Sequence, residues 1–163
     1  MTTELHPLGF FLPENTRLLM LGSFPPPKAR WSMDFYYPNI QNDMWRILGL
    51  IFYGNKDAFL RDKKAFSEEK AKAFCREKGI GIGDTAMEVI RLKANASDKF
   101  LEVVRPIDPE KVLSQIPECV AIVVTGQKAM DTLLLRIARH GGAESGLLVG
   151  IFLYGKDDEA VPY

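Results

Sequence analysis

The sequence predicts a single α/β domain, a three-layer sandwich with a short, mainly parallel central sheet and helices on both faces. Four short, almost continuously apolar segments predict strands at 17–23, 80–84, 119–125 and 147–153. Such runs are typical of strands buried on both faces of a parallel sheet. Helical sequence separates the strands, which favours crossover connections. The 163 residues and 47% apolar composition are enough for one hydrophobic core, so we expect one domain over 1–163.

The helices follow from apolar spacing and from their end signals. Met44 begins a helix whose apolar residues recur every three or four positions until Gly54-Asn55 ends the pattern. The charged stretch 56–79 predicts helices on a solvated face, ended by Gly79. After the second strand we expect a turn and a polar segment, then a short helix from Pro109 and a longer one over 127–142.

Charge and cysteine content exclude several classes of protein. Lys plus Arg and Asp plus Glu number 21 each, so no global field attracts polyanions and any nucleic-acid binding must be local. Cys75 and Cys119 belong to no CxxC or Cys/His cluster, which indicates free thiols and no metal site. The sequence shows no signal-peptide pattern and no apolar run of about 18 residues. We therefore expect a soluble, cytoplasmic protein, and a monomer.

The connection after the first strand is unusually long. It runs from Phe24 to about Ile40 and contains three consecutive prolines followed by the aromatic residues Trp31, Phe35, Tyr36 and Tyr37. Ligands of open parallel sheets bind beyond the carboxyl ends of the strands, and connections there usually need only a few residues. The loop therefore predicts a binding site, although a lid that packs its rings on the core is the alternative. Its single Gly22 matches neither glycine-rich nucleotide fingerprint, which argues against a nucleotide cofactor.

Three segments of this region resemble a known family. They are Gly22-Ser23-Phe24-Pro25-Pro26, Phe35-Tyr36-Tyr37 and Gln41-Asn42-Asp43-Met44-Trp45. Together they resemble the first motif region of the uracil-DNA glycosylase superfamily, and most of all its hypoxanthine-DNA glycosylase-like branch, with looser similarity through "GIGDTAMEVIR" and "VVTGQKA". The resemblance implies a three-layer α/β fold, excision of damaged or deaminated bases from DNA, and no metal or organic cofactor.

The resemblance also implies roles for individual residues. Enzymes that act on a base flip it from the duplex, stack a ring on it and hydrogen-bond its edge. Asn42 aligns with the catalytic asparagine of the branch, whereas helix capping is its structural alternative. Asn39 is the other candidate for the residue that caps this helix, and it occupies the position where the branch commonly has histidine. The residues expected to bind the base are Gly22, Ser23, Phe24, Phe35, Tyr36, Tyr37 and Asn39.

Other candidates follow from their place next to predicted strands. Asp84 ends the second strand and is either a catalytic acid or water-holding residue, or the cap of a turn. The residues expected to contact DNA are Pro25, Lys28 and Arg30 in the long loop and Gly126 and Lys128 at a strand–helix turn. The alternatives are that the turn only connects a strand to a helix and that the two loop cations occur by chance. His6 and His140 are expected to have surface or helix-end roles.

The sequence also departs from the family pattern. Phe24 stands where the uracil-specific branches have a water-activating Asp or Asn, and a phenyl ring cannot polarise water. Pro26 replaces a small glycine. The second motif, a loop that penetrates the duplex, normally follows the last strand, and here the sequence ends at Tyr163. We therefore expect either a truncated chain or a protein that has lost this motif.

Three functions remain open at this point. The first is a monofunctional DNA base-excision repair glycosylase acting on uracil or hypoxanthine, with DNA as its partner. The second is a non-catalytic module that binds nucleobases or nucleic acid, which Phe24 and the missing second motif favour. The third is a small-molecule enzyme on a similar sheet.

Overall fold

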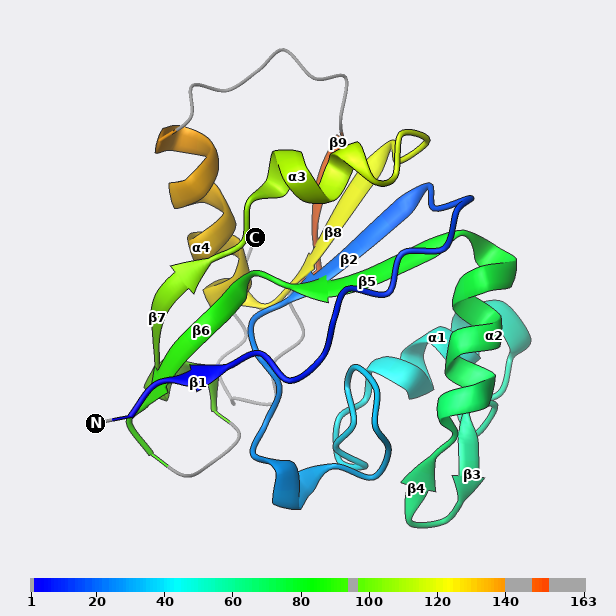
Figure 1. The fold of residues 1–163 in the computed structure, drawn as a ribbon. Coiled ribbons are helices and arrows are strands. Elements are labelled where there is room, and N and C mark those ends of the chain that lie inside the picture. Colours follow the sequence, from blue (N-terminus) through cyan, green and yellow to red (C-terminus); the bar gives the residue numbers. More distant parts are fainter. Residues whose placement is uncertain (1, 94–96, 140–147, 153–163) are drawn as a thin grey trace, which may run out of the picture.

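The structure is a computed structural model that describes residues 2–93, 97–139 and 148–152 (Figure 1). The expectations about His140 and about the segment after the last strand lie outside these residues.

A four-stranded parallel sheet forms the centre of the molecule. Its strands are β2 (Leu18–Gly22), β5 (Ile80–Asp84), β8 (Ala121–Thr125) and β9 (Leu148–Phe152), in the order β5-β2-β8-β9. Every neighbouring pair is parallel. The four strands predicted from the sequence are confirmed, with ends that differ by no more than two residues.

Helices cover both faces of this sheet. On one face lie α1 (Met44–Tyr53) and α2 (Glu68–Lys78), and on the other lie α3 (Pro109–Ser114) and α4 (Gln127–Arg139) (Figure 1). The strands supply alternate side chains to the two cores: Met20 faces α1 and α2, whereas Leu19 and Leu21 face α3 and α4. The predicted three-layer α/β architecture is confirmed.

A second sheet flanks the first. It consists of β1 (Glu4–Leu5), β6 (Ala86–Arg91) and β7 (Leu101–Pro106), paired antiparallel in the order β1-β6-β7. The prediction of a turn and a polar segment after β5 was therefore wrong. Polar residues interrupt both long strands and most of their side chains are only partly buried or exposed, so they lack the continuous apolar run that identified the central strands.

The charged stretch 56–79 is only partly helical. A short hairpin, β3 (Leu60–Asp62) and β4 (Ala65–Phe66), precedes α2. Phe59 and Phe66 are both buried and lie seven residues apart, a spacing that also corresponds to two helical turns. The sequence pattern therefore suggested one continuous helical region where the chain in fact reverses direction.

The segment before β2 protects the edge of the central sheet at β5. Phe11 and Ile82 exchange both backbone hydrogen bonds, at 3.0 and 2.9 Å. The ring of Phe10 lies where a Cβ at Gly83 would stand, at 2.0 Å from that position. Strand β5 thus contains glycine because the N-terminal segment packs directly on its backbone.

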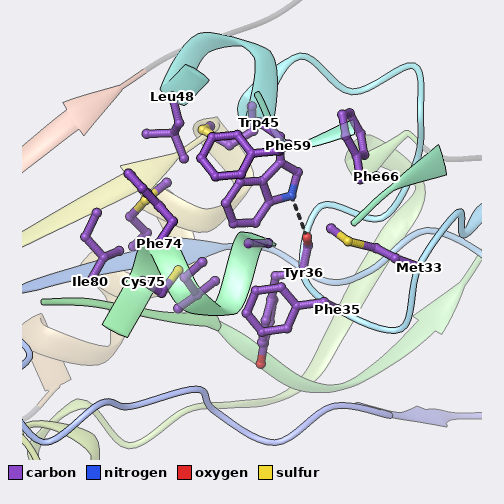
Figure 2. Close-up of a cluster of buried hydrophobic side chains, with 14 residues drawn as sticks. Met33, Phe35, Tyr36, Trp45, Leu48, Phe59, Phe66, Phe74, Cys75 and Ile80 are labelled. Carbon is purple, nitrogen blue, oxygen red and sulfur yellow. Dashed lines mark hydrogen bonds between the residues drawn. The ribbon is translucent and has the colours of Figure 1, made fainter. Parts of the chain in front are cut away.

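The long loop after β2 is fastened to α1 by one tryptophan. Trp45 is fully buried, and its Nε1–H donates a hydrogen bond of 3.0 Å to the carbonyl oxygen of Tyr36 (Figure 2). Its indole stacks against Phe35, with ring centroids 6.1 Å apart, and contacts Phe59 at 5.1 Å. The aromatic cluster therefore fixes the loop residues that precede α1.

Replacing Trp45 should test this anchor. We expect Trp45→Phe to lower the free energy of unfolding by about 1–3 kcal/mol, because the Tyr36 carbonyl loses its donor. Trp45→Ala should cost about 3–5 kcal/mol, since it also leaves a cavity. Denaturant unfolding measures both. Leu50→Ala, at a side chain that is 55% exposed, is the control and should change stability by less than about 0.5 kcal/mol. Equal values for the phenylalanine variant and the control would contradict the anchoring role.

Candidate active site

A cavity of about 200 Å³ lies at the carboxyl ends of β2, β5 and β8. This is below the range of about 300–1,000 Å³ common for drug-sized ligands, and it suits a ligand of one or two fused rings. The lining comes from the long loop between β2 and α1, the first residue of α1, the ends of β2, β5 and β8, and the short 3₁₀ helix Asp98–Phe100. Its residues are Gly22, Ser23, Phe24, Pro25, Pro26, Tyr36, Tyr37, Pro38, Asn39, Asn42, Met44, Asp84, Asp98, Thr125 and Gly126.

Aromatic side chains make one part of this lining. The Tyr36 hydroxyl donates to the carbonyl of Gly9 at 3.1 Å, and the Tyr37 hydroxyl lies 2.8 Å from Oγ1 of Thr125. Tyr37 has a backbone φ of +52°, a left-handed conformation that is unfavourable for a bulky side chain. Strain of this kind persists only where the surrounding structure enforces it, and it is often found at functional sites.

Both phenols remain protonated at neutral pH. Burial raises the pKa of Tyr36 and of Tyr37, and the nearby Asp84 carboxylate raises both further. For Tyr37 the bond with Thr125 opposes the rise only in part. The two hydroxyls are therefore neutral hydrogen-bonding groups beside the cavity.

Asp84 is held by a histidine from the far N-terminus. His6 Nε2 lies 2.7 Å from Asp84 Oδ2, and the His6 side chain is only 2% exposed. The other ring nitrogen, Nδ1, lies 2.7 Å from the Leu8 carbonyl and 3.1 Å from the Leu8 amide, which fixes the ring plane. The edge of Phe24 packs on the imidazole at 5.2 Å. The expectation of a surface role for His6 was wrong. Strand β1 pairs with β6, and this pairing places His6, the residue after β1, at the end of β5.

The same carboxylate explains why residue 22 is glycine. A Cβ at Gly22 would lie 2.6 Å from Asp84 Oδ1 and 3.4 Å from the Tyr37 hydroxyl. The strand end must therefore have no side chain if the acid and the phenol are to approach it.

A second carboxylate lines the cavity, and no sequence pattern predicted it. Asp98 begins the short 3₁₀ helix Asp98–Phe100, and the hydroxyl of Ser23 donates to its Oδ2 at 2.8 Å. Burial raises the pKa of the Asp98 carboxyl, and Asp84 adds to the rise, whereas Ser23, Lys128 and Arg91 oppose it. Asp98 lies in a polar stretch without apolar periodicity, and 75 residues separate it from its partner Ser23.

The two asparagines of the loop make local contacts. Asn42 lines the cavity, and its Oδ1 accepts a hydrogen bond of 2.9 Å from the amide of Met44 in the first turn of α1. The Asn39 Oδ1 accepts from the amide of Gln41 at 3.0 Å. Asn42 thus binds the first amide of α1 from one position before Asp43, the N-cap residue, and the Asn42 amide nitrogen has no hydrogen-bond partner among the described residues. Asn39 stabilises the turn before it.

Several predicted site residues lie elsewhere. Phe35 is buried in the α1 core against Trp45 and does not line the cavity, which corrects the expectation that it stacks on a base. Lys28 and Arg30 are exposed on a short 3₁₀ helix outside the cavity; the Lys28 ammonium lies 2.8 Å from Asp34. Lys128 is half-buried at the start of α4 and also lies outside the lining.

The described part of the chain contains no group of three or more His, Cys, Asp or Glu side chains able to hold a metal ion. Among the same residues, no helix is both long and apolar enough to cross a membrane. Cys75 and Cys119 are free, and burial raises the pKa of Cys75 to about 12.

The fold and the cavity place the chain among α/β proteins with a ligand site at the ends of parallel strands. No family model and no curated protein matches the chain. Its structure is similar to the solution NMR structure of "a putative Uracil DNA glycosylase from Methanosarcina acetivorans", with a TM-score of 0.66 and 23% sequence identity. The similarity covers 90% of this chain and 81% of that chain. The two proteins share a fold.

The Asp98 carboxyl should make stability depend on pH. Its pKa is higher in the folded chain than in the unfolded chain, so folding favours the protonated form. This group's contribution to stability is fully present at low pH and falls as the pH rises through the raised pKa. Asp98→Asn should therefore raise the free energy of unfolding relative to the parent more at pH 8 than at pH 4, as thermal or denaturant unfolding would measure. Asp57→Asn, at an exposed aspartate, should show no such difference, and a pH-independent effect of Asp98→Asn would contradict the assignment.

Proposed function

We propose that the protein is a DNA glycosylase of base-excision repair that hydrolyses the N-glycosidic bond of a deaminated base, uracil or hypoxanthine, and leaves an abasic site. One observation carries this proposal. The cavity is built from Gly22, Ser23 and Phe24 together with Tyr36, Tyr37 and Asn42, which are the segments that resemble the hypoxanthine-DNA glycosylase-like branch. The fold shared with the Methanosarcina structure supports it.

The shape and polarity of the cavity suit a flipped base. An extruded base needs flat surfaces for its faces and hydrogen-bonding groups for its edge. Phe24, Tyr36 and Tyr37 supply aromatic surface, and Asn42, Thr125 and the phenol hydroxyls supply polar groups. Carboxylates at the same site suit the other half of the reaction, because positive charge develops on the sugar as the bond to the base breaks.

Asn42 is the proposed catalytic amide. It precedes α1, whose first-turn amides also favour negative charge. Its Oδ1 is held by the Met44 amide, which fixes the side chain and leaves Nδ2 to donate a hydrogen bond to the departing base or to hold water. Asp84, held by His6, is the second catalytic candidate.

DNA contact in this proposal is local, since the chain has no net charge. Gly126 borders the cavity and Lys128 follows it in the first turn of α4, where backbone amides favour phosphate. Pro25 lies on the cavity rim, and Lys28 and Arg30 are exposed further along the same loop. We propose that the protein acts without a cofactor, as a cytoplasmic monomer.

A non-catalytic module that binds nucleobases is the second candidate, and one observation favours it. Phe24 lines the cavity at the position where uracil-specific relatives have a water-activating group. Such a module would bind an extruded base or single-stranded DNA and leave the glycosidic bond intact.

Base release distinguishes the two. The protein would be incubated with oligonucleotides that contain uracil, hypoxanthine or xanthine, and the products treated with alkali to cleave abasic sites. A glycosylase yields strand breaks at the modified position, with free base in solution. Binding without any break would favour the non-catalytic module.

Substitutions at Asn42 should separate capping from catalysis. Asn42→Asp retains a capping oxygen and should fold as well as the parent, whereas Asn42→Ala should cost about 1 kcal/mol of stability. If Asn42 is catalytic, the folded alanine variant should excise its base roughly a hundredfold more slowly in single-turnover assays, with DNA binding little changed. An excision rate equal to that of the parent at matched folding would leave Asn42 as a cap only.

Substitutions at Tyr37 should test base stacking. Stacking contributes on the order of 1–3 kcal/mol per base, so Tyr37→Ala should weaken binding of single-stranded DNA roughly tenfold or more. Tyr37→Phe retains the ring and loses only the contact with Thr125, so it should bind nearly as well as the parent. Tyr53→Ala, at a half-exposed ring on α1, is the control. Fluorescence anisotropy measures all three, and equal affinity for Tyr37→Ala and the control would remove Tyr37 from the site.

A further inference from the structure

Two carboxylates from different elements face the same cavity, and each has one oxygen engaged and one free of hydrogen bonds within the described chain. Asp84 Oδ2 binds His6, and Asp84 Oδ1 lies against the backbone of Gly22. Asp98 Oδ2 accepts from the Ser23 hydroxyl, and Asp98 Oδ1 has no hydrogen-bond partner among the described residues. The two acids line one small cavity and influence each other electrostatically.

The hydrogen-bond partners of the two acids differ. Asp84 Oδ2 lies 2.7 Å from a histidine ring nitrogen, and this contact is an ion pair when the ring is protonated. Asp98 accepts only a neutral hydroxyl and lies beside the anion of Asp84, which favours its protonated form. When two nearby acids have unequal surroundings, the one whose surroundings oppose ionisation is suited to donate a proton.

Charged and titratable groups from several elements act on Asp98. Lys128 of α4 and Arg91 of β6 favour its anion, and Asp84 of β5 opposes it. Tyr37 of the long loop is coupled to the same carboxyl and stays neutral at physiological pH. Burial of the carboxyl acts in the same direction as Asp84, and its pKa is raised.

We propose that Asp98 is the general acid of the site and donates its carboxyl proton to a ring nitrogen of the departing base, while the Asp84 anion stabilises positive charge on the sugar. This inference rests on the proposed glycosylase function and deepens it. It assigns the acid to the 3₁₀ helix before β7, an element outside every segment that carries the family resemblance.

Proton donation by Asp98 lets the base leave as a neutral molecule. The bond between C1′ of the sugar and N9 of hypoxanthine breaks, and its electron pair stays on the base. The proton of Asp98 passes to a second ring nitrogen of the purine, so the base leaves neutral. Water then adds its oxygen to C1′ and gives a proton to the Asp98 carboxylate, which restores the acid. A purine needs this help more than 5-fluorouracil, which leaves readily as an anion because two carbonyl groups delocalise its charge and the fluorine withdraws electron density.

The pH dependence of single-turnover excision tests the proposal. In the parent, release of hypoxanthine from an oligonucleotide should fall about tenfold per pH unit above the pKa of Asp98, because only the protonated carboxyl donates. Asp98→Asn should excise hypoxanthine roughly a hundredfold more slowly and lose this alkaline decline. Its loss on a 5-fluorouracil oligonucleotide should be less than about tenfold. Asp98→Glu should recover part of the rate, and Asp57→Asn should match the parent.

The possible results separate the two proposals. If the parent releases neither base, the glycosylase function fails, and the acid role fails with it. If the parent releases 5-fluorouracil but not hypoxanthine, or if hypoxanthine release falls towards low pH with no alkaline decline, only the acid role is overturned. Equal losses of Asp98→Asn on both substrates also overturn the acid role, because they indicate water activation or a structural role.

Discussion

The hydrogen bond from the Trp45 indole to the Tyr36 carbonyl is the contact on which the cavity depends. It joins the first turn of α1 to a loop that has few backbone bonds of its own, and the aromatic cluster around it excludes water. A buried carbonyl without a donor is costly, so this hydrogen bond favours one position of the loop. In that position Tyr37 has a left-handed backbone conformation, and its hydroxyl lies next to Thr125 at the end of β8. Anchoring α1 also positions Asn42, which lies two residues before Met44, the first residue of the helix.

The second sheet brings His6 and Asp98 to the cavity at the end of the central sheet. Three central strands end at the cavity in Gly22, Asp84 and Thr125. Asp84 is the only ionisable side chain among these three residues. Antiparallel pairing of β1 with β6 brings His6 to Asp84 across 78 residues, and β7 follows the 3₁₀ helix that holds Asp98. A parallel α/β sheet with an antiparallel sheet beside its carboxyl edge can therefore surround a cavity with side chains from five elements. The acids are buried there at some cost in stability, which their single hydrogen bonds offset only in part.

The sequence predicted those features that arise from short-range patterns. Continuous apolar runs located all four central strands, and the loop after β2 was identified by its length, prolines and rings. Phe35 and Tyr37 show the limit of this reasoning, because neighbouring aromatic residues look alike in sequence while backbone direction decides which one enters the core. His6 and Asp98 could not be found at all. Each acts through a partner at least 75 residues away, and no local pattern records such a pairing.

Phe24 gives a physical reason for the arrangement of the acids. Its ring packs edge-on against His6 at 5.2 Å and lies 5.8 Å from the Arg91 guanidinium, so it shields the His6–Asp84 pair from solvent. A carboxylate at position 24 would be a third acid in one small cavity, where like charges repel one another. An apolar ring at this position therefore allows two acids to approach from β5 and from the 3₁₀ helix. On this argument, an acid introduced at position 24 would require the loss of Asp84 or Asp98 to keep the number of carboxyl groups in the cavity at two.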